Sequence, residues 1–318
     1  MALYLVTGGA GFIGSNLVEE LLGLGEGVRV LDNFATAPES NLAPFKERIE
    51  LIRGDIRDLA TCRTATRGAD YVLHQAALGS VPRSIDDPLT TDAVNTRGTL
   101  NLLLAAREAR VKRFVFASSS SIYGDQPQPP GASGPQPKVE TMFPRPASPY
   151  AVSKLAAESY CQVFWRCYGL PTVALRYFNI FGPRQDPASQ YAAVVPKFCA
   201  ALLDGTRPVI FGDGLQSRDF TYVANAVAAN LLACRAPEAA FGQAFNVGCA
   251  ASFSVRHLLA TFEALSGRQA DIDYQPPRPG DVRDSLADIS KARRLLGYEP
   301  TVGFDEGMKI TWEWYKSR

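Results

Sequence analysis

A cluster of glycines directly after the first predicted strand limits most strongly how this chain can fold. Residues 3–7 form a short apolar run, and the sequence from 7 to 14 carries glycine at positions 8, 9, 11 and 14. From residue 12 to 24, apolar residues recur at the spacing of an amphipathic helix. A strand that passes into a helix through so short a glycine turn is typical of the first βα unit of a parallel sheet.

The alternation of strand and helix continues through the first half of the chain. Further strands are predicted at 28–32, 50–54, 70–74, 113–117 and 172–177, and long helices at 91–107 and 150–168. This order predicts an α/β fold, in which a Rossmann-type doubly wound parallel sheet carries helices on both faces.

After residue 178 the regular alternation of strand and helix ends. Glycine and proline become frequent there, and the predicted helices become shorter. We expect the sheet domain at 1–178, with a return segment near 215–240, and a smaller α/β C-terminal lobe at 179–318 that mainly binds substrate. A chain of 318 residues is long enough for two such units.

Composition and charge argue against several classes of function. The 33 Lys and Arg residues balance 32 Asp and Glu residues, so the chain lacks the basic excess of a nucleic-acid-binding protein. Its apolar runs are far shorter than the ~18 residues of a membrane span, and the N-terminus does not resemble a signal peptide. Six scattered cysteines and two histidines predict buried thiols rather than disulfides or a metal site. We therefore expect a cytoplasmic protein without a nucleic-acid or membrane partner.

The glycine turn has the spacing of a dinucleotide-binding fingerprint. Gly8, Gly11 and Gly14 give G-x-x-G-x-x-G, in which the middle glycine lets the backbone approach a pyrophosphate at the N-terminus of the helix. Asp32 ends the second strand 18 residues after Gly14, where a carboxylate can hydrogen-bond a ribose hydroxyl. Because that carboxylate would repel a 2′-phosphate, the pattern predicts NAD rather than NADP. Asp55, after the third strand, is either a contact to adenine or a solvated loop residue.

A tyrosine and a lysine four residues apart indicate general base chemistry. On a helix, Tyr150 and Lys154 share one face, and the ammonium would lower the pKa of the phenol from about 10. Such a phenol could deprotonate a sugar hydroxyl near neutral pH. The serines at 118–121 follow a predicted strand, at the sheet edge where α/β proteins bind ligands. A hydroxyl there either holds the reacting oxygen or forms a polar exit from the strand.

Together these motifs are similar to those of one enzyme family. The chain resembles an extended short-chain dehydrogenase/reductase, and within that group the UDP-hexose 4-epimerases, closest to the UDP-N-acetylglucosamine 4-epimerases. The matching stretches extend from residue 3 to about residue 298 and include 7–14, 74–77, 118–124, 150–154, 176–182, 212–219, 246–248 and 278–281. The resemblance implies a tightly held NAD, a transient 4-keto sugar, and a homodimer formed through the two long helices.

The resemblance also implies roles for individual residues. Tyr150 would be the catalytic base, Lys154 would tune it and hold the nicotinamide ribose, and Ser119 would lie beside O4 of the sugar. The implied cofactor-binding residues are Gly8, Gly11, Phe12, Ile13, Gly14, Asp32, Asn33, Asp55, Ile56, Gln75, Ala76, Ala77, Asn95, Ala117, Tyr150, Lys154 and Tyr177. The implied substrate-binding residues are Gly79, Ser80, Ser119, Ser120, Asn179, Val195, Arg218, Arg278, Asp281 and Ser285, with the two arginines on the diphosphate and Asp281 on the uridine ribose.

The two residues after the predicted catalytic hydroxyl differ from those of related enzymes, and this difference limits which reactions the chain can catalyse. Dehydratases carry Asp-Glu directly after the catalytic hydroxyl, at the positions of Ser120 and Ser121 in this chain. Nucleotide-sugar decarboxylases usually carry glutamate at the position of Ser121. Without these carboxyl groups, elimination lacks its acid and base. A UDP-glucuronate decarboxylase, a 4,6-dehydratase and a catalytically idle NAD-binding sensor remain the alternatives to an epimerase.

A second departure concerns the room beside C2 of the sugar. Epimerases restricted to UDP-glucose and UDP-galactose often have tyrosine at the position of Ser285, and serine leaves room for an N-acetyl group. The sequence at 78–83 also resembles epimerases that prefer UDP-GlcNAc and UDP-GalNAc. We therefore expect N-acetylated UDP-hexoses, with the unacetylated pair as further candidates, unless another side chain closes the pocket.

Overall fold

Seven parallel strands form the central sheet of the protein. The computed structural model describes residues 1–127, 131, 134–187, 192–277 and 282–318. The strands are ordered β11-β6-β5-β4-β1-β2-β3, and each pairs in parallel with its neighbours. They are β1 (Leu3–Thr7), β2 (Gly27–Asp32), β3 (Glu50–Arg53), β4 (Tyr71–His74), β5 (Arg113–Ser119), β6 (Thr172–Tyr177) and β11 (Gln243–Val247). The predicted Rossmann-type fold is confirmed.

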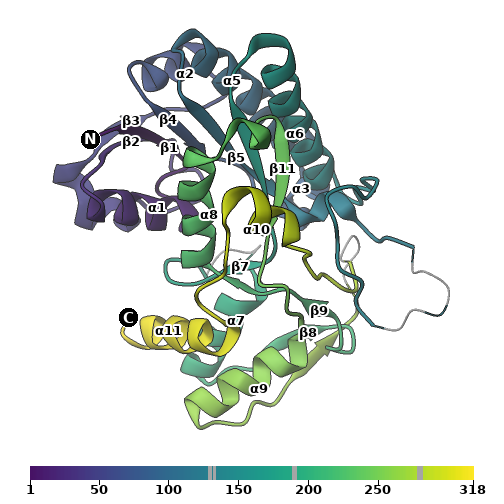
Figure 1. Cartoon of the computed structure of the whole chain (residues 1–318). Helices are drawn as coiled ribbons and strands as arrows, with labels where there is room; N and C mark the ends of the chain where they lie inside the picture. The colour runs from purple at the N-terminus through teal and green to yellow at the C-terminus, as the bar shows by residue number, and fades with distance from the viewer. Residues whose placement is uncertain (128–130, 132–133, 188–191, 278–281) are drawn as a thin grey trace.

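Helices cover both faces of this sheet (Figure 1). On one face lie α1 (Phe12–Gly23) and α8 (Val223–Arg235), and on the other lie α2 (Leu59–Thr66), α5 (Gly98–Glu108) and α6 (Pro149–Tyr168). Side chains along each strand alternate between two apolar cores: Val6 joins the core that contains residues of α1, and Leu5 joins the core that contains residues of α5. Burial on both faces explains why the strands read as continuous apolar runs.

Residues after β6 build most of a second lobe, which lies below the sheet in Figure 1. Its helices α7 (Val194–Asp204), α9 (Val255–Ser266) and α11 (Phe304–Lys316) pack against one another. Three pairs of short strands brace it: β7 (Ile180–Phe181) with β10 (Thr221–Tyr222), β8 (Val209–Phe211) with β13 (Asp273–Gln275), and β9 (Ser217–Arg218) with β12 (Phe253–Ser254). Among the helices of the described ranges, none has both the length and the apolar character needed to cross a bilayer.

The chain returns to the sheet after the second lobe has begun. α8 lies in the stretch where the sequence predicts a return, and it packs against β5 and β6. The returning strand is β11, which follows at residues 243–247, and α10 (Ser290–Leu296) contacts it. Several crossings of the chain therefore join the carboxyl edge of the sheet to the second lobe.

The helix that carries the Tyr-Lys pair begins and ends close to its predicted limits. Ser148 caps α6 by accepting a 3.2 Å hydrogen bond from the N–H of Ala151, and Pro149 occupies the first turn. Gly169 ends the helix with a φ of +67°, a left-handed conformation that glycine adopts without strain. Local sequence signals thus fix the position of Tyr150 at the start of α6.

The other long helix, predicted at 91–107, lies within a continuous helical stretch that contains a π-helical turn, which the sequence did not predict. After α3 (Val81–Asp86), the chain forms α4 (Pro88–Asp92), a wide π-helical turn (Ala93–Arg97) and then α5. In the wide turn, Asn95 reaches the loop after β4, where its Oδ1 accepts from the N–H of Leu78 at 2.8 Å and its Nδ2 donates to the Leu78 carbonyl at 3.2 Å. This tertiary contact, which helical periodicity does not encode, accounts for the interruption.

Candidate active site

A cleft of about 540 Å³ opens at the carboxyl edge of the sheet. Its walls come from the glycine turn after β1, the ends of β4, β5 and β6, the start of α6 and loops of the second lobe. A smaller cavity of about 150 Å³ adjoins it beside β2 and β3, and the two share residues that include Gly11 and Gln75. Together they suit a cofactor and a substrate, and this edge is where α/β proteins bind ligands.

The glycine turn forms a cradle at the start of α1, and the surrounding backbone leaves no room for side chains at Gly8 and Gly14. A Cβ atom on Gly14 would lie 2.1 Å from the carbonyl oxygen of Gly8, and one on Gly8 would lie 2.7 Å from the backbone of Ala76. Gly11 caps α1 without a side chain, and the first turn of α1 carries no acidic residue. The first N–H groups of α1 are therefore open to an anion, and the cradle fits the pyrophosphate of a dinucleotide.

Asp32 links the glycine turn to the smaller cavity. Its carboxylate accepts hydrogen bonds from the N–H of Ala10 at 2.9 Å and of Phe34 at 2.8 Å. Burial raises the pKa of Asp32, and these hydrogen bonds oppose the rise. The carboxylate oxygens keep further acceptor positions for a ribose hydroxyl. Asp55 lines the same cavity, and its hydrogen bonds to Arg57, 2.7 Å away, lower the pKa of Asp55 to about 2.

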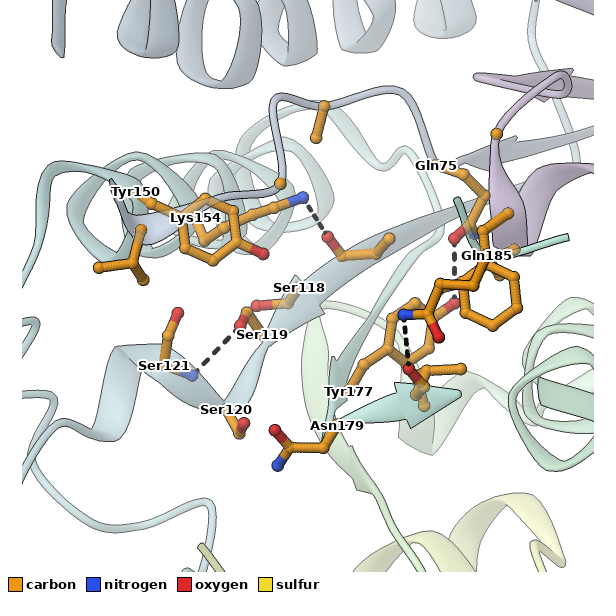
Figure 2. A pocket seen from close by; sticks show the side chains of 18 of the residues that line it. Gln75, Ser118, Ser119, Ser120, Ser121, Tyr150, Lys154, Tyr177, Asn179 and Gln185 are labelled. Carbon is orange, nitrogen blue, oxygen red and sulfur yellow. Dashed lines mark hydrogen bonds between the residues drawn. The ribbon is translucent and has the colours of Figure 1, made fainter. Parts of the chain in front are cut away.

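The phenol of Tyr150 and the hydroxyl of Ser119 meet in the larger cleft (Figure 2). Both side chains line this cleft, and Ser119 Oγ accepts a hydrogen bond from the N–H of Ser121 at 3.1 Å. Burial raises the pKa of Tyr150, while the neighbouring Ser119 hydroxyl lowers it in part. A phenolate at neutral pH therefore requires a positive charge beside the phenol.

Lys154 lies one turn from Tyr150, but its ammonium is bonded to the strand beneath the helix. Its Nζ donates a 2.7 Å hydrogen bond to the carbonyl oxygen of Ala117 and lies 5.0 Å from the centre of the Phe116 ring. Burial lowers the pKa of Lys154 to about 7. In this structure Lys154 thus fixes α6 to the end of β5, and its predicted effect on the phenol requires a change of hydrogen-bond partner.

A buried ion pair joins α6 to β6 beneath the cleft. Glu158 and Arg176 form two hydrogen bonds, of 2.6 and 3.0 Å, and their side chains are at most 5% exposed. Arg176 Nη1 donates to the hydroxyl of Tyr123 at 2.8 Å, and that hydroxyl donates to Asn246 Oδ1 at 2.6 Å. The network fixes the relative positions of the strands and of the helix that carry the reactive side chains.

Most residues implied by the family resemblance line one of the two cavities. The larger cleft is lined by Gly8, Gly11, Phe12, Ile13, Gly14, Gln75, Ala77, Gly79, Ala117, Ser119, Ser120, Tyr150, Lys154, Tyr177, Asn179, Arg218 and Ser285. The smaller cavity adds Asp32, Asn33, Asp55, Ile56 and Ala76. Arg278 and Asp281 lie outside the described residues.

Three residues expected to contact ligand lie away from both cavities. Val195 is 2% exposed and packs in the core of the second lobe. Asn95 is buried, and Ser80 caps α3 by accepting a 3.3 Å hydrogen bond from the N–H of Arg83. Asn95 and Ser80 therefore support the loop that carries Gly79, which does line the cleft.

The chain beyond β6 contributes three of the predicted substrate contacts. Asn179 follows β6 with a φ of +30°, an uncommon backbone conformation for a non-glycine residue and one that often marks functional positions. Arg218 Nη1 donates to the carbonyl oxygens of Ser217 at 2.8 Å and Arg283 at 2.9 Å. Ser285 is 5% exposed, and its N–H donates to the carbonyl of Ser217 at 3.1 Å. The short strand at Ser217 therefore positions both Arg218 and Ser285.

Other residues that line the cleft were not predicted. They include Thr36, Ala37, Pro38, Asn41, Lys138, Ala147, Ser148, Arg184, Gln185 and Asp186. The first four come from the irregular connection after β2, which shows no periodic pattern. Arg184 directly follows a Gly-Pro turn at the end of the matching stretch 176–182. This position is the sequence signal that could have identified Arg184 as a residue of the cleft.

Comparison with known proteins assigns the family. A family model described as the NAD dependent epimerase/dehydratase family matches residues 4–248. The chain belongs to this family. The cofactor of this epimerase/dehydratase family is NAD, which the glycine turn and the adjoining cavity fit. The chain is also 39% identical to a UDP-glucose 4-epimerase of Mycolicibacterium smegmatis, over 99% of this chain and 98% of the relative.

Two solved structures show the same similarity to members of the epimerase/dehydratase family. A UDP-glucose 4-epimerase from Thermotoga maritima, solved with UDP-glucose, is 38% identical, with a TM-score of 0.92 over 99% of both chains. A UDP-N-acetylglucosamine 4-epimerase from Methanobrevibacter ruminantium, in complex with UDP-N-acetylmuramic acid, is 39% identical, with a TM-score of 0.91 over 99% of this chain and 98% of that one. The protein is thus an NAD-dependent enzyme, and because the family's name includes dehydratases, family membership alone does not define its reaction.

Proposed function

We propose that the protein catalyses the 4-epimerisation of UDP-hexoses through a 4-keto intermediate. The observation that carries the proposal is that Tyr150 and Ser119 line the same cleft, which also contains the glycine cradle. When bound, NAD supplies the acceptor and the donor of hydride at C4 of the sugar. In this proposal the domain at 1–178 holds NAD, and the lobe at 179–318 mainly holds the UDP-sugar.

Tyr150 and Ser119 would share the proton of the O4 hydroxyl. Tyr150 takes the proton as a phenolate, and Ser119, which the N–H of Ser121 holds in place, hydrogen-bonds the reacting oxygen. Because burial disfavours the phenolate, Tyr150 needs a nearby cation, and Lys154, on the same face of α6, would supply one once its ammonium leaves the carbonyl of Ala117. Tyr150 returns the proton after the sugar has presented its other face.

The residues after Ser119 favour epimerisation over elimination. Ser120 and Ser121 line the cleft, and Ser121 Oγ is buried with no hydrogen-bond partner in the described part of the chain. Neither side chain can act as a carboxylic acid or a carboxylate, so neither can replace the acid-base pair of a dehydratase or the glutamate of a decarboxylase. A catalytically idle NAD-binding sensor would need neither Tyr150 nor Ser119.

Small residues in the cleft favour N-acetylated sugars. Ser285 lines the cleft, and a Cβ atom added at Gly79 would meet no other atom within 4 Å. We therefore assign UDP-GlcNAc and UDP-GalNAc as the preferred pair, and UDP-glucose and UDP-galactose as the second pair. Of the two similar structures, one is named a UDP-glucose 4-epimerase and the other a UDP-N-acetylglucosamine 4-epimerase, which supports both assignments. Arg218 would contact the diphosphate together with Arg278, and Asp281 would contact the uridine ribose.

Turnover of defined nucleotide sugars tests this function. The purified protein is incubated with UDP-GlcNAc, with and without added NAD, and the anomeric protons are followed by NMR. Formation of UDP-GalNAc supports the proposal, and inhibition by UDP-glucose measures the affinity for the second pair. A 4-keto-6-deoxy sugar, or release of carbon dioxide from UDP-glucuronate, would identify a dehydratase or a decarboxylase. NAD binding without conversion of any substrate would identify the sensor.

The surface of α6 supports a homodimer formed through α5 and α6. Val152, Tyr160 and Val163 on α6 are 52%, 37% and 44% exposed, and Leu89 on the neighbouring α4 is 83% exposed. Such a group of exposed apolar side chains is typical of an interaction surface. Light scattering at micromolar concentration should give the mass of two chains, and a Val163→Asp variant should give the mass of one.

We also place the enzyme in the cytoplasm. The six cysteines form no disulfide in the structure, as expected in a reducing compartment. Fractionation of cells that produce the protein would test the location, and recovery from an extracytoplasmic fraction would contradict it.

A further inference from the structure

The turn after β7 brings a cation to the first helix of the sheet domain. Arg184 Nη2 donates hydrogen bonds to Asn16 Oδ1 at 2.8 Å and to Glu19 Oε2 at 2.5 Å, and Asn16 Nδ2 donates to the carbonyl oxygen of Pro183 at 3.3 Å. Asn16 and Glu19 belong to α1, whose N-terminal end forms part of the glycine cradle. Arg184 therefore lies beside the cofactor side of the cleft, although 165 residues separate it from Glu19.

Arg184 keeps hydrogen-bond donors that the described residues do not use. Its side chain is 12% exposed, and the residue lines the larger cleft together with Gly11 and Phe12. Its Nε is buried without a hydrogen-bond partner among the described residues, and both of its side-chain hydrogen bonds come from Nη2. Because a guanidinium carries five N–H donors, the described residues take up only part of its hydrogen-bonding capacity.

The backbone of Arg184 is held in an uncommon conformation. Its φ is +71°, in the left-handed region that residues other than glycine adopt at a cost. Such strain persists where the surrounding structure fixes it, and it often marks ligand-binding positions. The ion pair with Glu19 does not account for it, because Glu19 is 56% exposed and exposed ion pairs contribute little.

The charges around Arg184 favour an anionic ligand at the start of α1. No acidic residue lies in the first turn of α1, so its N–H groups add to the positive charge of the guanidinium. We propose that Arg184 binds the pyrophosphate of NAD and thereby slows release of the cofactor. The guanidinium fork suits a phosphate, and the contact would add a residue from beyond β6 to a cofactor site built mainly by the sheet domain. The inference rests on the use of NAD and is independent of which UDP-sugar is converted.

The affinity of an Arg184→Gln variant for NAD tests this proposal. Cofactor is removed from the full chain, and isothermal titration calorimetry measures the Kd for NAD and, separately, for UDP. We expect the Kd for NAD to rise at least tenfold and the Kd for UDP to change less than threefold. Arg184→Lys keeps the charge but loses the fork, so it should fall between the wild type and Arg184→Gln. The NAD that remains bound after gel filtration should decrease in the same order.

Two control variants separate the phosphate contact from the loss of an ion pair. Glu19→Gln removes the exposed partner of Arg184 and should leave the Kd for NAD within threefold of the wild type. Arg63→Gln removes another exposed ion pair, to Glu108, and should have no effect on NAD. If Arg184→Gln does not fold, the Kd for NAD of Arg184→Lys is compared with that of Glu19→Gln. A Kd that rises in Arg184→Lys but stays within threefold of the wild type in Glu19→Gln supports the proposal.

Four outcomes would overturn the proposal. Unchanged NAD affinity in the Arg184 variants, or an equal loss in Glu19→Gln, would show that Arg184 does not contact the cofactor. Weaker binding of UDP with unchanged binding of NAD would assign Arg184 to the substrate diphosphate instead. A wild-type chain that does not bind NAD would overturn the cofactor assignment as well.

Discussion

The hydroxyl of Ser118 donates a 2.6 Å hydrogen bond to Oε2 of Glu158, which lies about two turns beyond Tyr150 on α6. The register of β5 and β6 places Ser118 opposite Arg176, so the same carboxylate also meets the Arg176 guanidinium. Ser118 immediately precedes Ser119. The contact therefore ties the strand that presents Ser119 to the helix that presents Tyr150.

Removal of Glu158 should destabilise the protein strongly. A Glu158→Ala variant leaves the buried Arg176 guanidinium without its counter-ion, and breaking such a pair typically costs about 3–5 kcal/mol of the free energy of unfolding. The matched control is Glu108→Ala, whose pair with Arg63 is about half exposed and should contribute far less to stability. Urea denaturation compares the two. Similar midpoints for both variants would show that the buried pair is not a stabilising contact.

Replacement of Tyr150 by phenylalanine should remove the base and leave the ligand sites intact. General base catalysis contributes roughly 100- to 10,000-fold, so turnover of UDP-GlcNAc by Tyr150→Phe should fall by at least ~100-fold. Tyr160→Phe, on the partly exposed side of the same helix, should retain normal turnover. Calorimetric titration should give unchanged affinities for NAD and UDP. Turnover of Tyr150→Phe close to the wild-type value would rule out the assignment of Tyr150 as the base.

Six of the seven strands of the sheet could be predicted well from the sequence, whereas β11 was not predicted. β1 and β6 coincide with their predicted limits, because apolar residues buried on both faces of a parallel sheet form short continuous runs. The glycine turn and Asp32 were also predicted, since their spacing follows from the geometry of one βα unit. The predicted helix at 91–107 is helical throughout, but its π-helical turn was missed because Asn95 contacts a loop 17 residues earlier in the chain.

Contacts between distant segments could not be predicted. Glu158 and Arg176 meet because the sheet register brings Ser118 and Arg176 together, and no local pattern specifies that register. The spacing of Tyr150 and Lys154 does predict one helix face, but it does not show that the Lys154 ammonium bonds to the carbonyl of Ala117. Which side chains meet across different helices and strands depends on how these elements pack. Which side chains share a face of one helix depends only on their spacing in the sequence, so it can be predicted.

The identity of residue 285 should decide which sugars fit. Ser285 is 5% exposed and lines the cleft, so a tyrosine at this position would occupy space that we assign to the N-acetyl group. Ser285→Tyr should reduce kcat/KM for UDP-GlcNAc by at least ~100-fold while UDP-glucose keeps most of its turnover. Ser285→Ala, the matched control, should convert both. Equal loss of both substrates in Ser285→Tyr would contradict the steric argument.

The buried His74 should make stability depend on pH in the acidic range. Its Nδ1 lies 2.7 Å from Thr7 Oγ1 and its Nε2 lies 2.9 Å from Thr99 Oγ1. Because the Thr99 hydroxyl donates to the carbonyl of Asn95 at 2.6 Å, it accepts from Nε2, and Nδ1 therefore accepts from Thr7. This arrangement requires the neutral imidazole. Burial lowers the pKa of His74 to about 3.

The sign of the effect follows from proton binding in the two states. An unfolded histidine titrates near pH 6.5 and folded His74 near pH 3, so the unfolded chain binds more protons between these values and stability falls as pH decreases through this range. From pH 8 to pH 5 the wild type should lose about 2 kcal/mol through this one group, since each unit of difference is worth about 1.4 kcal/mol. His74→Gln should lack this loss, and His257→Gln, which replaces the exposed histidine, should retain it. Denaturation midpoints are measured at each pH to give the dependence of stability on pH. If this dependence is the same in His74→Gln and the wild type, His74 is not a neutral buried imidazole.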